Sequence, residues 1–172
     1  VLRAKLGSRE ARPIHYRQHP DKLDLPALLD FLIGLPGPRI AVFNTVQTAA
    51  VVALALKKEA GQGKVEHLST ALTPADREIT LKRVKVRLED KQDTDWTLVA
   101  PSLVEAGVDI SFHSGIREAS SLPSLLQLGG RVNRHDEHGE GEVWSVSLRP
   151  GGGIREHRAM QIPAAVLARL FK

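Results

Sequence analysis

The chain has 172 residues, of which 42% are hydrophobic and 26% are charged, and this balance predicts one globular domain with a sizeable core instead of two full domains. It contains no cysteine (Cys 0), which excludes disulfides and thiolate metal sites and favours a reducing compartment. The small excess of 24 Lys and Arg over 20 Asp and Glu permits a polyanionic partner without demonstrating one.

Short apolar runs rich in β-branched residues alternate with longer helical patterns along the chain, which predicts an α/β domain with a mostly parallel sheet. In chain order we first expect an edge strand over 12–18, a helix over 23–35, a buried strand over 39–43 and a helix from Asn44 or Thr45 to Gly61. A strand over 65–68 and a helix from Thr73 to about Leu88 follow. The rest of the chain should form strands over 96–100 and 108–112, a helix over 121–134, a strand over 141–148 and a last helix over 163–171. Residues 1–36 would be a lead-in strand and helix, 37–150 the domain core, and 151–172 a loop and final helix.

Polar side chains follow three of the predicted strands at the point where each strand ends. These are Asn44 with Thr45, Ser69 with Thr70, and Ser102. Because the carboxyl ends of parallel strands meet at one edge of a sheet, and ligands bind in that crevice, we expect a site there. Asn44 and Thr45 at a helix start can hold a phosphate, although ordinary helix capping explains each of them equally well.

Arg131 and Arg134 raise the question of which anion they bind. They lie three residues apart in a predicted helix, behind two glycines, so both guanidinium groups would project from one helix face. Two such groups can hold a multiply charged oxyanion, as an arginine finger does in phosphoryl transfer. The glycines would let another backbone or a phosphate approach closely. A solvated basic helix end paired with Glu137 or Glu140 explains the same pattern about equally well.

Four segments resemble the motifs of superfamily 2 helicases and come in the matching order. "VFNTVQTA" is similar to motif IV, "HLSTALTPADRE" to the motif between IV and V, "SLVEAGVDI" to motif V and "QLGGRVNRHDEHG" to motif VI. The spacing agrees over roughly 40–144, so the combined signal is strong. The combination looks most like the helicase part of the CRISPR-associated nuclease-helicase of type I systems. It implies a RecA-like second helicase domain, an open, mostly parallel sheet with helices on both faces.

The resemblance implies a role for each matching residue. Three residues would face the ATP triphosphate: Gln127, Arg131 and Arg134, of which Arg134 would be the arginine finger. Gly107, Asp109 and Gly130 would lie beside the nucleotide. Single-stranded DNA would be held by its phosphates, without base reading, on Asn44, Thr45, Ser69, Thr70, Arg77 and Ser102. The implied cofactors are ATP and Mg²⁺, and the implied partners are single-stranded DNA, the first RecA-like domain of the same protein and a CRISPR surveillance complex.

The sequence departs from the family pattern at two positions and lacks two motifs. Pro101 stands where a threonine commonly contacts a phosphate, and Leu128 where an arginine is common, and neither side chain can donate a hydrogen bond. There is no G-x-x-x-x-G-K-[ST] loop and no acidic magnesium box, since "GQGKV" carries Val65 where a hydroxyl is needed. We therefore expect the other half of the ATP site on another domain, and this chain alone to be nearly inactive as an ATPase.

Other interpretations of the same residues stay open at this stage. The two acids and two histidines of "HDEHGEG" could suggest a metal site, but a solvated connection is the more usual fate of such a run, so we predict no metal site. The domain could instead be a degenerate RecA-like module that binds nucleic acid or a partner without hydrolysing ATP, or part of an RNA helicase. The longest nearly uncharged run, 40–56, is too short and too polar to span a bilayer, and no secretory leader precedes the first element, so we expect a cytoplasmic protein without membrane contact.

Overall fold

The computed structural model describes residues 14–101, 110–134 and 140–171. Within these ranges the elements are β1 (Ile14–Leu23), α1 (Leu25–Gly34), β2 (Arg39–Val42), α2 (Val46–Ala60), β3 (Val65–His67), α3 (Pro74–Glu89), β4 (Thr97–Ala100), β5 (Ser114–Glu118), α4 (Leu122–Gly129), β6 (Gly141–Leu148) and α5 (Gln161–Arg169). Short 3-10 helices span Gln62–Lys64 and Arg158–Met160.

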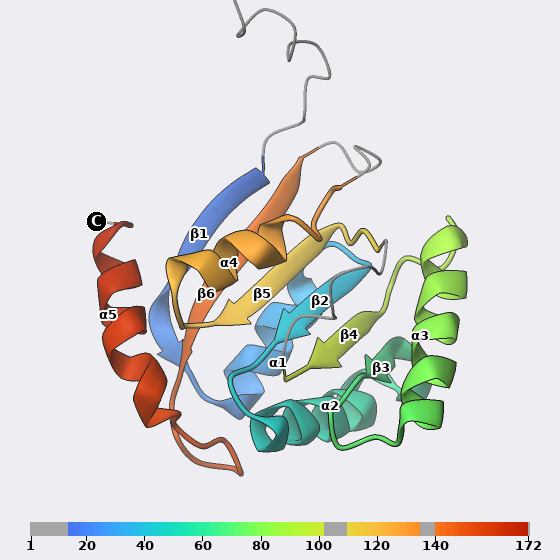
Figure 1. Ribbon diagram of the computed structural model, residues 1–172, viewed down its shortest axis with the longest axis horizontal. Coiled ribbons are helices and arrows are strands. Elements are labelled where there is room, and N and C mark those ends of the chain that lie inside the picture. The colour runs from blue at the N-terminus through green and yellow to red at the C-terminus, as the bar shows by residue number, and fades with distance from the viewer. Residues whose placement is uncertain (1–13, 102–109, 135–139, 172) are drawn as a thin grey trace, which may run out of the picture.

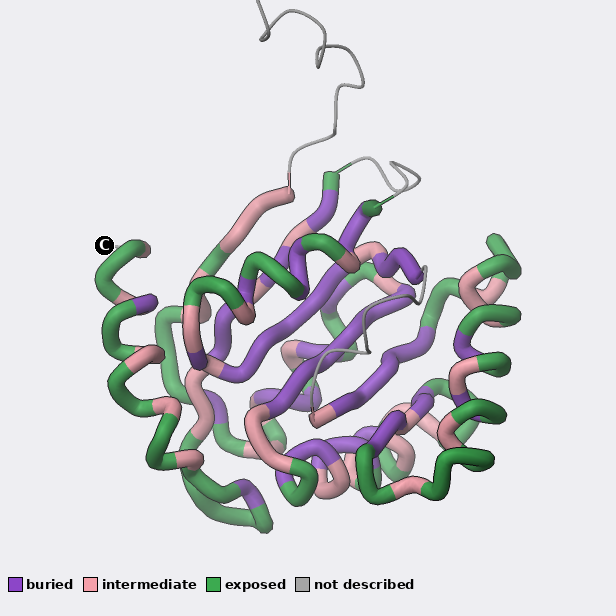
Figure 2. The backbone as a smooth tube through the Cα atoms, viewed as in Figure 1, coloured by how far each residue is buried: buried purple, intermediate pink, exposed green. Residues whose placement is uncertain are grey.

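The strands form one sheet in the order β1-β6-β5-β2-β4-β3, and every neighbouring pair is parallel. Figure 1 shows α3 and α4 on the front face of this sheet, α1 and α2 behind it, and α5 beside the β1 edge. The predicted α/β class, with an open parallel sheet covered by helices on both faces, is confirmed. A parallel sheet covered in this way has its central strands fully buried. Every residue of β2, β4 and β5 is buried, as the purple tube in Figure 2 shows.

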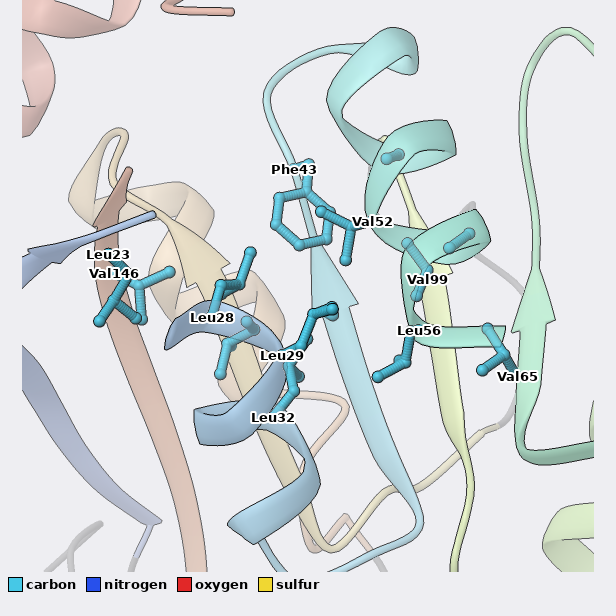
Figure 3. Packing of buried hydrophobic residues seen from close by; sticks show 14 of the residues in the cluster. Leu23, Leu28, Leu29, Leu32, Phe43, Val52, Leu56, Val65, Val99 and Val146 are labelled. Atoms are coloured by element: carbon cyan, nitrogen blue, oxygen red, sulfur yellow. The ribbon is translucent and has the colours of Figure 1, made fainter. Parts of the chain in front are cut away.

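The core behind the sheet consists of aliphatic side chains from α1 and α2 packed on the strands. Leu28 and Leu32 of α1 are fully buried, and Val52 of α2 lies against the same cluster. Figure 3 shows Val52 beside Phe43, the residue that follows β2 directly, and Leu28 and Leu32 further along the same cluster. The apolar spacing of three and four residues in both helices therefore buries one face of each, as the periodicity predicts.

The core in front of the sheet is built around two aromatic rings. Trp96 and Phe112 are both 0% exposed and pack edge to face, with ring centroids 5.8 Å apart. Val84 of α3 and Leu125 and Leu128 of α4 close over them. Apolar contacts therefore hold both α3 and α4 on the front face of the sheet.

The predicted helix starts are confirmed by their caps. Thr45 accepts a hydrogen bond from the amide of Thr48 at the start of α2, and Thr73 accepts one from Asp76 at the start of α3. Ser121 does the same for α4. Each cap satisfies a backbone donor that the first helical turn leaves without a partner. At the other end of α2, Gly61 has φ +102°, a backbone conformation that favours glycine.

The strand predicted over 108–112 is wrong in the described part of that range. Phe112 forms only an isolated bridge with Val132, and Ile110 and Ser111 belong to no strand. The strand lies further along, over Ser114–Glu118, in a segment that alternates poorly and carries two charged residues. Strand propensity disfavours glycine and charged residues, so the sequence pattern pointed to the more apolar neighbour.

The helix predicted over 121–134 ends earlier, at Gly129. The amide of Gly130 closes the last turn onto the carbonyl of Leu126, and Asn133 has φ +49°, outside the helical region. A Cβ at Gly129 would collide with the hydroxyl and ring of Tyr16, so the expected close approach at the glycines is made by a side chain of β1. Arg131 and Arg134 therefore lie in a turn, and the prediction that they share one helix face is wrong.

Candidate functional site

The polar residues predicted to be functional fall at two opposite edges of the sheet. Asn44 and Thr45 follow the carboxyl end of β2, and Ser69 and Thr70 follow that of β3. The segment with Arg131 instead lies at the amino edge, because the carbonyl of Arg131 accepts a hydrogen bond from the amide of Phe112 (2.8 Å), just before β5 begins. The strand ends and the arginine turn are thus separated by the length of the strands, as Figure 1 also shows.

Asn44 is fixed in place by β5 at the carboxyl edge. Its backbone amide donates to Oε2 of Glu118 (2.7 Å), and its side-chain Nδ2 donates to the carbonyl of Ala119 (3.0 Å). Its Oδ1 is buried and has no hydrogen-bond partner among the described residues. Thr45 beside it accepts the amide of Thr48 (3.0 Å), so its hydroxyl is a helix cap whatever else it binds.

The second predicted group at this edge is less uniform. The hydroxyl of Ser69 accepts the amide of Ala71 (3.1 Å) and is buried, so it shapes the turn before α3. Thr70 is exposed, and Arg77 is half-buried on α3. The loop carrying Thr70 and the first turns of α3 therefore offer an exposed hydroxyl and a partly accessible guanidinium on the β3 side of the sheet. Ser102, Gly107 and Asp109 lie outside the described residues.

Two residues that sequence analysis missed occupy the carboxyl end of β5. Arg117 is 8% exposed and Glu118 is 6% exposed. Arg117 donates from Nε to the hydroxyl of Ser124 (2.9 Å) and from Nη1 to the carbonyl of Val42 (3.3 Å). Adjacent charged residues in an otherwise buried strand are an unusual signal, but it is visible only once the strand is located correctly.

Burial favours the neutral form of both groups, so it lowers the pKa of Arg117 and raises the pKa of Glu118. Desolvation lowers the pKa of Arg117 to about 10, although the negative charge of Glu118 opposes this shift. Desolvation also raises the pKa of Glu118, opposed mainly by the hydrogen bond from the amide of Asn44 and by the charge of Arg117. Groups perturbed in this way by burial cluster at functional sites, so the end of β5 is a candidate for one.

A cavity of about 330 Å³ opens beside these residues, between the strand ends and α5. Asn44, Glu118 and His157 form part of its polar wall, while Ala164 and Ala168 of α5 form part of its apolar wall. The Nδ1 atom of His157 is buried there without a hydrogen-bond partner in the described part of the chain. The carboxyl edge therefore combines backbone amides at the start of α2 with a small hollow that has both polar and apolar walls.

At the amino edge, the turn after α4 gathers the residues predicted to face a nucleotide. Gln127, Gly130 and Arg134 are exposed, and Arg131 is half-buried. The amide of Arg134 donates to the hydroxyl of Ser111 (2.9 Å). These four residues lie within eight positions of the chain, and three of them are exposed.

A second cavity, of about 500 Å³, borders the same turn through Ser111. Its walls include Arg87 of α3, whose Nε donates to Oδ2 of Asp93 (2.6 Å) and whose guanidinium lies 4.5 Å from the ring centroid of Trp96. These bonds hold Arg87 rigidly in the cavity wall. The amino edge therefore combines the exposed arginine turn with an adjoining hollow large enough for a small ligand.

The departure from the helicase pattern at Leu128 has a structural cause. Leu128 is 0% exposed and packs in the front core with Leu125 and Val132. An arginine at this position would bury its charge among apolar side chains, which costs several kcal/mol unless it is paired. In this fold, the Leu128 side chain packs in the front core, three residues before Arg131.

The described residues contain no group of three or more His, Asp or Glu side chains that could hold a metal ion. His135 to Gly139 of the "HDEHGEG" segment lie outside the described residues, while Glu140 is 3.3 Å from Nε2 of His15. Nor is any helix in the described ranges long and apolar enough to cross a bilayer.

Comparison with known proteins identifies the family. The model of the family described as CRISPR-associated nuclease/helicase Cas3, C-terminal, matches residues 37–137, more than half of the chain. A CRISPR-associated nuclease/helicase Cas3 of Haloferax volcanii is 31% identical over 90 residues, which cover 48% of this chain and 9% of that protein.

Solved structures show the same fold. The crystal structure of T. fusca Cas3-ATP matches with a TM-score of 0.64 at 18% identity, covering 95% of this chain and 20% of that one. The C-terminal domain of the DEAD-box protein Dbp5 matches with a TM-score of 0.56 at 16% identity, covering 84% of this chain and 80% of that one. The predicted RecA-like fold is confirmed, and the chain spans 9% and 20% of the two Cas3 proteins. It belongs to the family of the C-terminal part of the CRISPR-associated nuclease/helicase Cas3.

Proposed function

We propose that this chain is the second motor domain of an ATP-dependent helicase that translocates along single-stranded DNA in CRISPR interference. The observation that carries the proposal is the family match over 37–137, which spans the first three motif segments and all but the last two residues of the fourth. The first RecA-like domain of the same protein and a CRISPR surveillance complex would be its partners. The first domain would hold most of the ATP and Mg²⁺, since the phosphate loop is missing from this sequence.

In this proposal the arginine turn at the amino edge completes the ATP site. Arg134 would act as the arginine finger, with Arg131 and Gln127 beside it, and Gly107, Asp109 and Gly130 next to the nucleotide. Because negative charge develops on the transferred phosphoryl group, a positioned guanidinium lowers the barrier by electrostatic stabilisation. The exposure of Arg134 and Gln127 supports this role, since both side chains can meet a ligand held by a neighbouring domain.

At the carboxyl edge the chain would hold the DNA strand by its phosphates. Asn44 and Thr45 lie at the start of α2, where the positive end of the helix dipole favours an anion. Ser69, Thr70, Arg77 and Ser102 would extend this contact. Sequence-independent movement requires phosphate contacts of this kind instead of base readout.

The proposal is tested by replacing Arg134 with alanine in the full-length protein that carries this chain. We expect DNA-stimulated ATP turnover to fall about a thousandfold or more, because that is the usual contribution of an arginine finger. The matched control is Arg149→Ala, which removes another exposed arginine outside all four motifs. Near-normal turnover by the Arg134 variant, with circular dichroism unchanged, would remove Arg134 from the mechanism.

Two further comparisons separate the alternatives. If the full-length protein turns over no ATP with any nucleic acid, a binding module without ATPase activity is the better description. If single-stranded RNA stimulates turnover more than single-stranded DNA, the protein is an RNA helicase. The isolated 172-residue chain should show almost no turnover in either case.

A further inference from the structure

We propose that Arg117 is a positioning residue that couples the nucleic-acid edge of the sheet to the arginine turn at the opposite edge. This inference rests on the proposed function, since it assigns a coupling role between its two sites. Arg117 belongs to none of the four motif segments. We assign Arg117 no contact with ATP or DNA. It would act only through β2, β5 and α4, which its hydrogen bonds connect.

The Arg117 guanidinium is buried and forms no ion pair with a carboxylate of the described residues. No carboxylate of the described residues lies within ion-pair distance of it, although it is only 8% exposed. The neighbouring Glu118 accepts its hydrogen bond from Asn44 instead. Consecutive residues of a strand point to opposite faces, so the two charges face different layers of the fold.

The contrast with Arg39 makes this arrangement informative. Arg39 of β2 is buried to a similar extent, 7% exposed, but it pairs with Asp95 (2.7 Å) and donates to the carbonyl of Leu35 (2.6 Å). Arg39 is thus an ordinary structural arginine with a compensating charge. Burying a charge without such a partner costs free energy, so stability alone does not explain Arg117.

The Arg117 guanidinium connects three segments of the fold by hydrogen bonds. Nη1 donates to the carbonyl of Val42 (3.3 Å), the last residue of β2 and two residues before Asn44. Nη1 also donates to the carbonyl of Glu118 (3.2 Å), and Nε donates to the hydroxyl of Ser124 (2.9 Å) in the first turn of α4. One planar group therefore connects the ends of β2 and β5 with the start of α4.

Helix α4 leads directly to the arginine turn. The helix has 8 residues and is about 12 Å long, and the amide of Arg131 donates to the carbonyl of Leu128 (2.8 Å) at its end. A short helix moves as a rigid body. A displacement of Val42 and Asn44 by a bound strand is thus passed through Arg117 to α4, and through α4 to Arg131.

The experiment uses the full-length protein and three variants: Arg117→Met, Arg117→Lys and the control Arg39→Met. Four quantities are measured for each: the thermal midpoint, the affinity for a fluorescent oligo-dT, the ATP turnover without DNA, and the turnover with saturating oligo-dT. The ratio of the two turnover values reports coupling. A merely structural residue would change the midpoint and not this ratio at equal saturation.

We expect Arg117→Met to keep its thermal midpoint within a few degrees and its DNA affinity within about twofold, while the stimulation ratio falls about tenfold, a typical size for coupling between two sites. Arg117→Lys keeps the charge but loses the planar fork, so its ratio should lie between parent and Arg117→Met. Arg39→Met should lower the midpoint and leave the ratio unchanged.

The inference is overturned if Arg117→Met, or a folded Arg117→Lys where the methionine variant does not fold, keeps the parent ratio. It is also overturned if either variant changes the ratio only in proportion to a loss of DNA affinity, because that result assigns Arg117 to binding. A parent protein that shows no stimulation by DNA overturns the proposed function itself. The two failures are therefore distinguishable in one set of assays.

Discussion

The carboxylate of Glu118 accepts a hydrogen bond from the backbone amide of Asn44 at 2.7 Å, and this bond joins two residues that lie 74 positions apart in the sequence. It fixes the turn between β2 and α2, where the proposed phosphate contacts begin. The acid is nearly fully buried, so it holds this turn at the cost of its own desolvation. The bond therefore ties the start of α2 to the end of β5.

This burial predicts a specific pH dependence. Desolvation raises the pKa of Glu118 in the folded protein, so the folded state binds the proton more tightly than the unfolded chain does. The free energy of unfolding therefore decreases as the pH rises from the ordinary glutamate pKa through the raised value. Glu118→Gln cannot titrate and still offers an oxygen to the amide of Asn44. Its thermal midpoint relative to the parent should increase as the pH rises above the ordinary glutamate pKa.

Thermal unfolding of both proteins followed by circular dichroism across this pH range checks the prediction. If the thermal midpoints of parent and variant change in parallel with pH, the pKa of Glu118 does not differ between the folded and unfolded states, and the prediction is wrong.

The two roles of Thr45 can be separated by charge. Aspartate caps a helix at least as well as threonine, so Thr45→Asp should keep the free energy of unfolding within about 0.5 kcal/mol. It places a negative charge where a phosphate is proposed to bind, so affinity for single-stranded DNA should fall about five- to tenfold at low salt. Thr45→Ser, which keeps the cap without a charge, is the control. Equal affinities for the two variants in fluorescence anisotropy would argue that Thr45 is only a cap.

The glycine pair before the arginine turn should respond unequally to alanine. A Cβ at Gly129 would meet the hydroxyl and ring of Tyr16, whereas the nearest atom to one at Gly130 is the carbonyl oxygen of Gln127 at 3.4 Å. We therefore expect Gly129→Ala to destabilise the protein by about 1–3 kcal/mol through overpacking. Gly130→Ala should change the stability by less than about 1 kcal/mol. Urea unfolding measures both, and a similar loss in the two variants would contradict the packing explanation.

β5 and α4 are the elements whose bounds differ most from the prediction. The segment "SGIRE" was not predicted as a strand because it contains a glycine and two charges. In the fold, Gly115 leaves room for Val132 and Leu128, since an added Cβ would lie 3.1 Å and 3.3 Å from their side chains. The residue that weakened the strand signal is thus the one that lets α4 pack closely on the sheet, and only the assembled core reveals this.

Local signals, by contrast, located most elements well. The caps at Thr45, Thr73 and Ser121 depend on hydrogen bonds between residues three apart, which the sequence displays directly. The apolar spacing that located α1 and α2 also relates residues only three or four positions apart. The order of the four motif segments indicated the family, because order along the chain is a property of the sequence alone.

By itself, then, the sequence determined the α/β class, most helix starts and the family, since periodicity, caps and motif order act over a few residues or along the chain. Only the tertiary structure decided that α4 ends before the arginines, that these lie at the edge opposite Asn44, and that Arg117 and Glu118 are buried. These features depend on contacts between segments far apart in sequence. Burial and hydrogen bonding across such distances are set by how the whole sheet packs, and no local pattern encodes them.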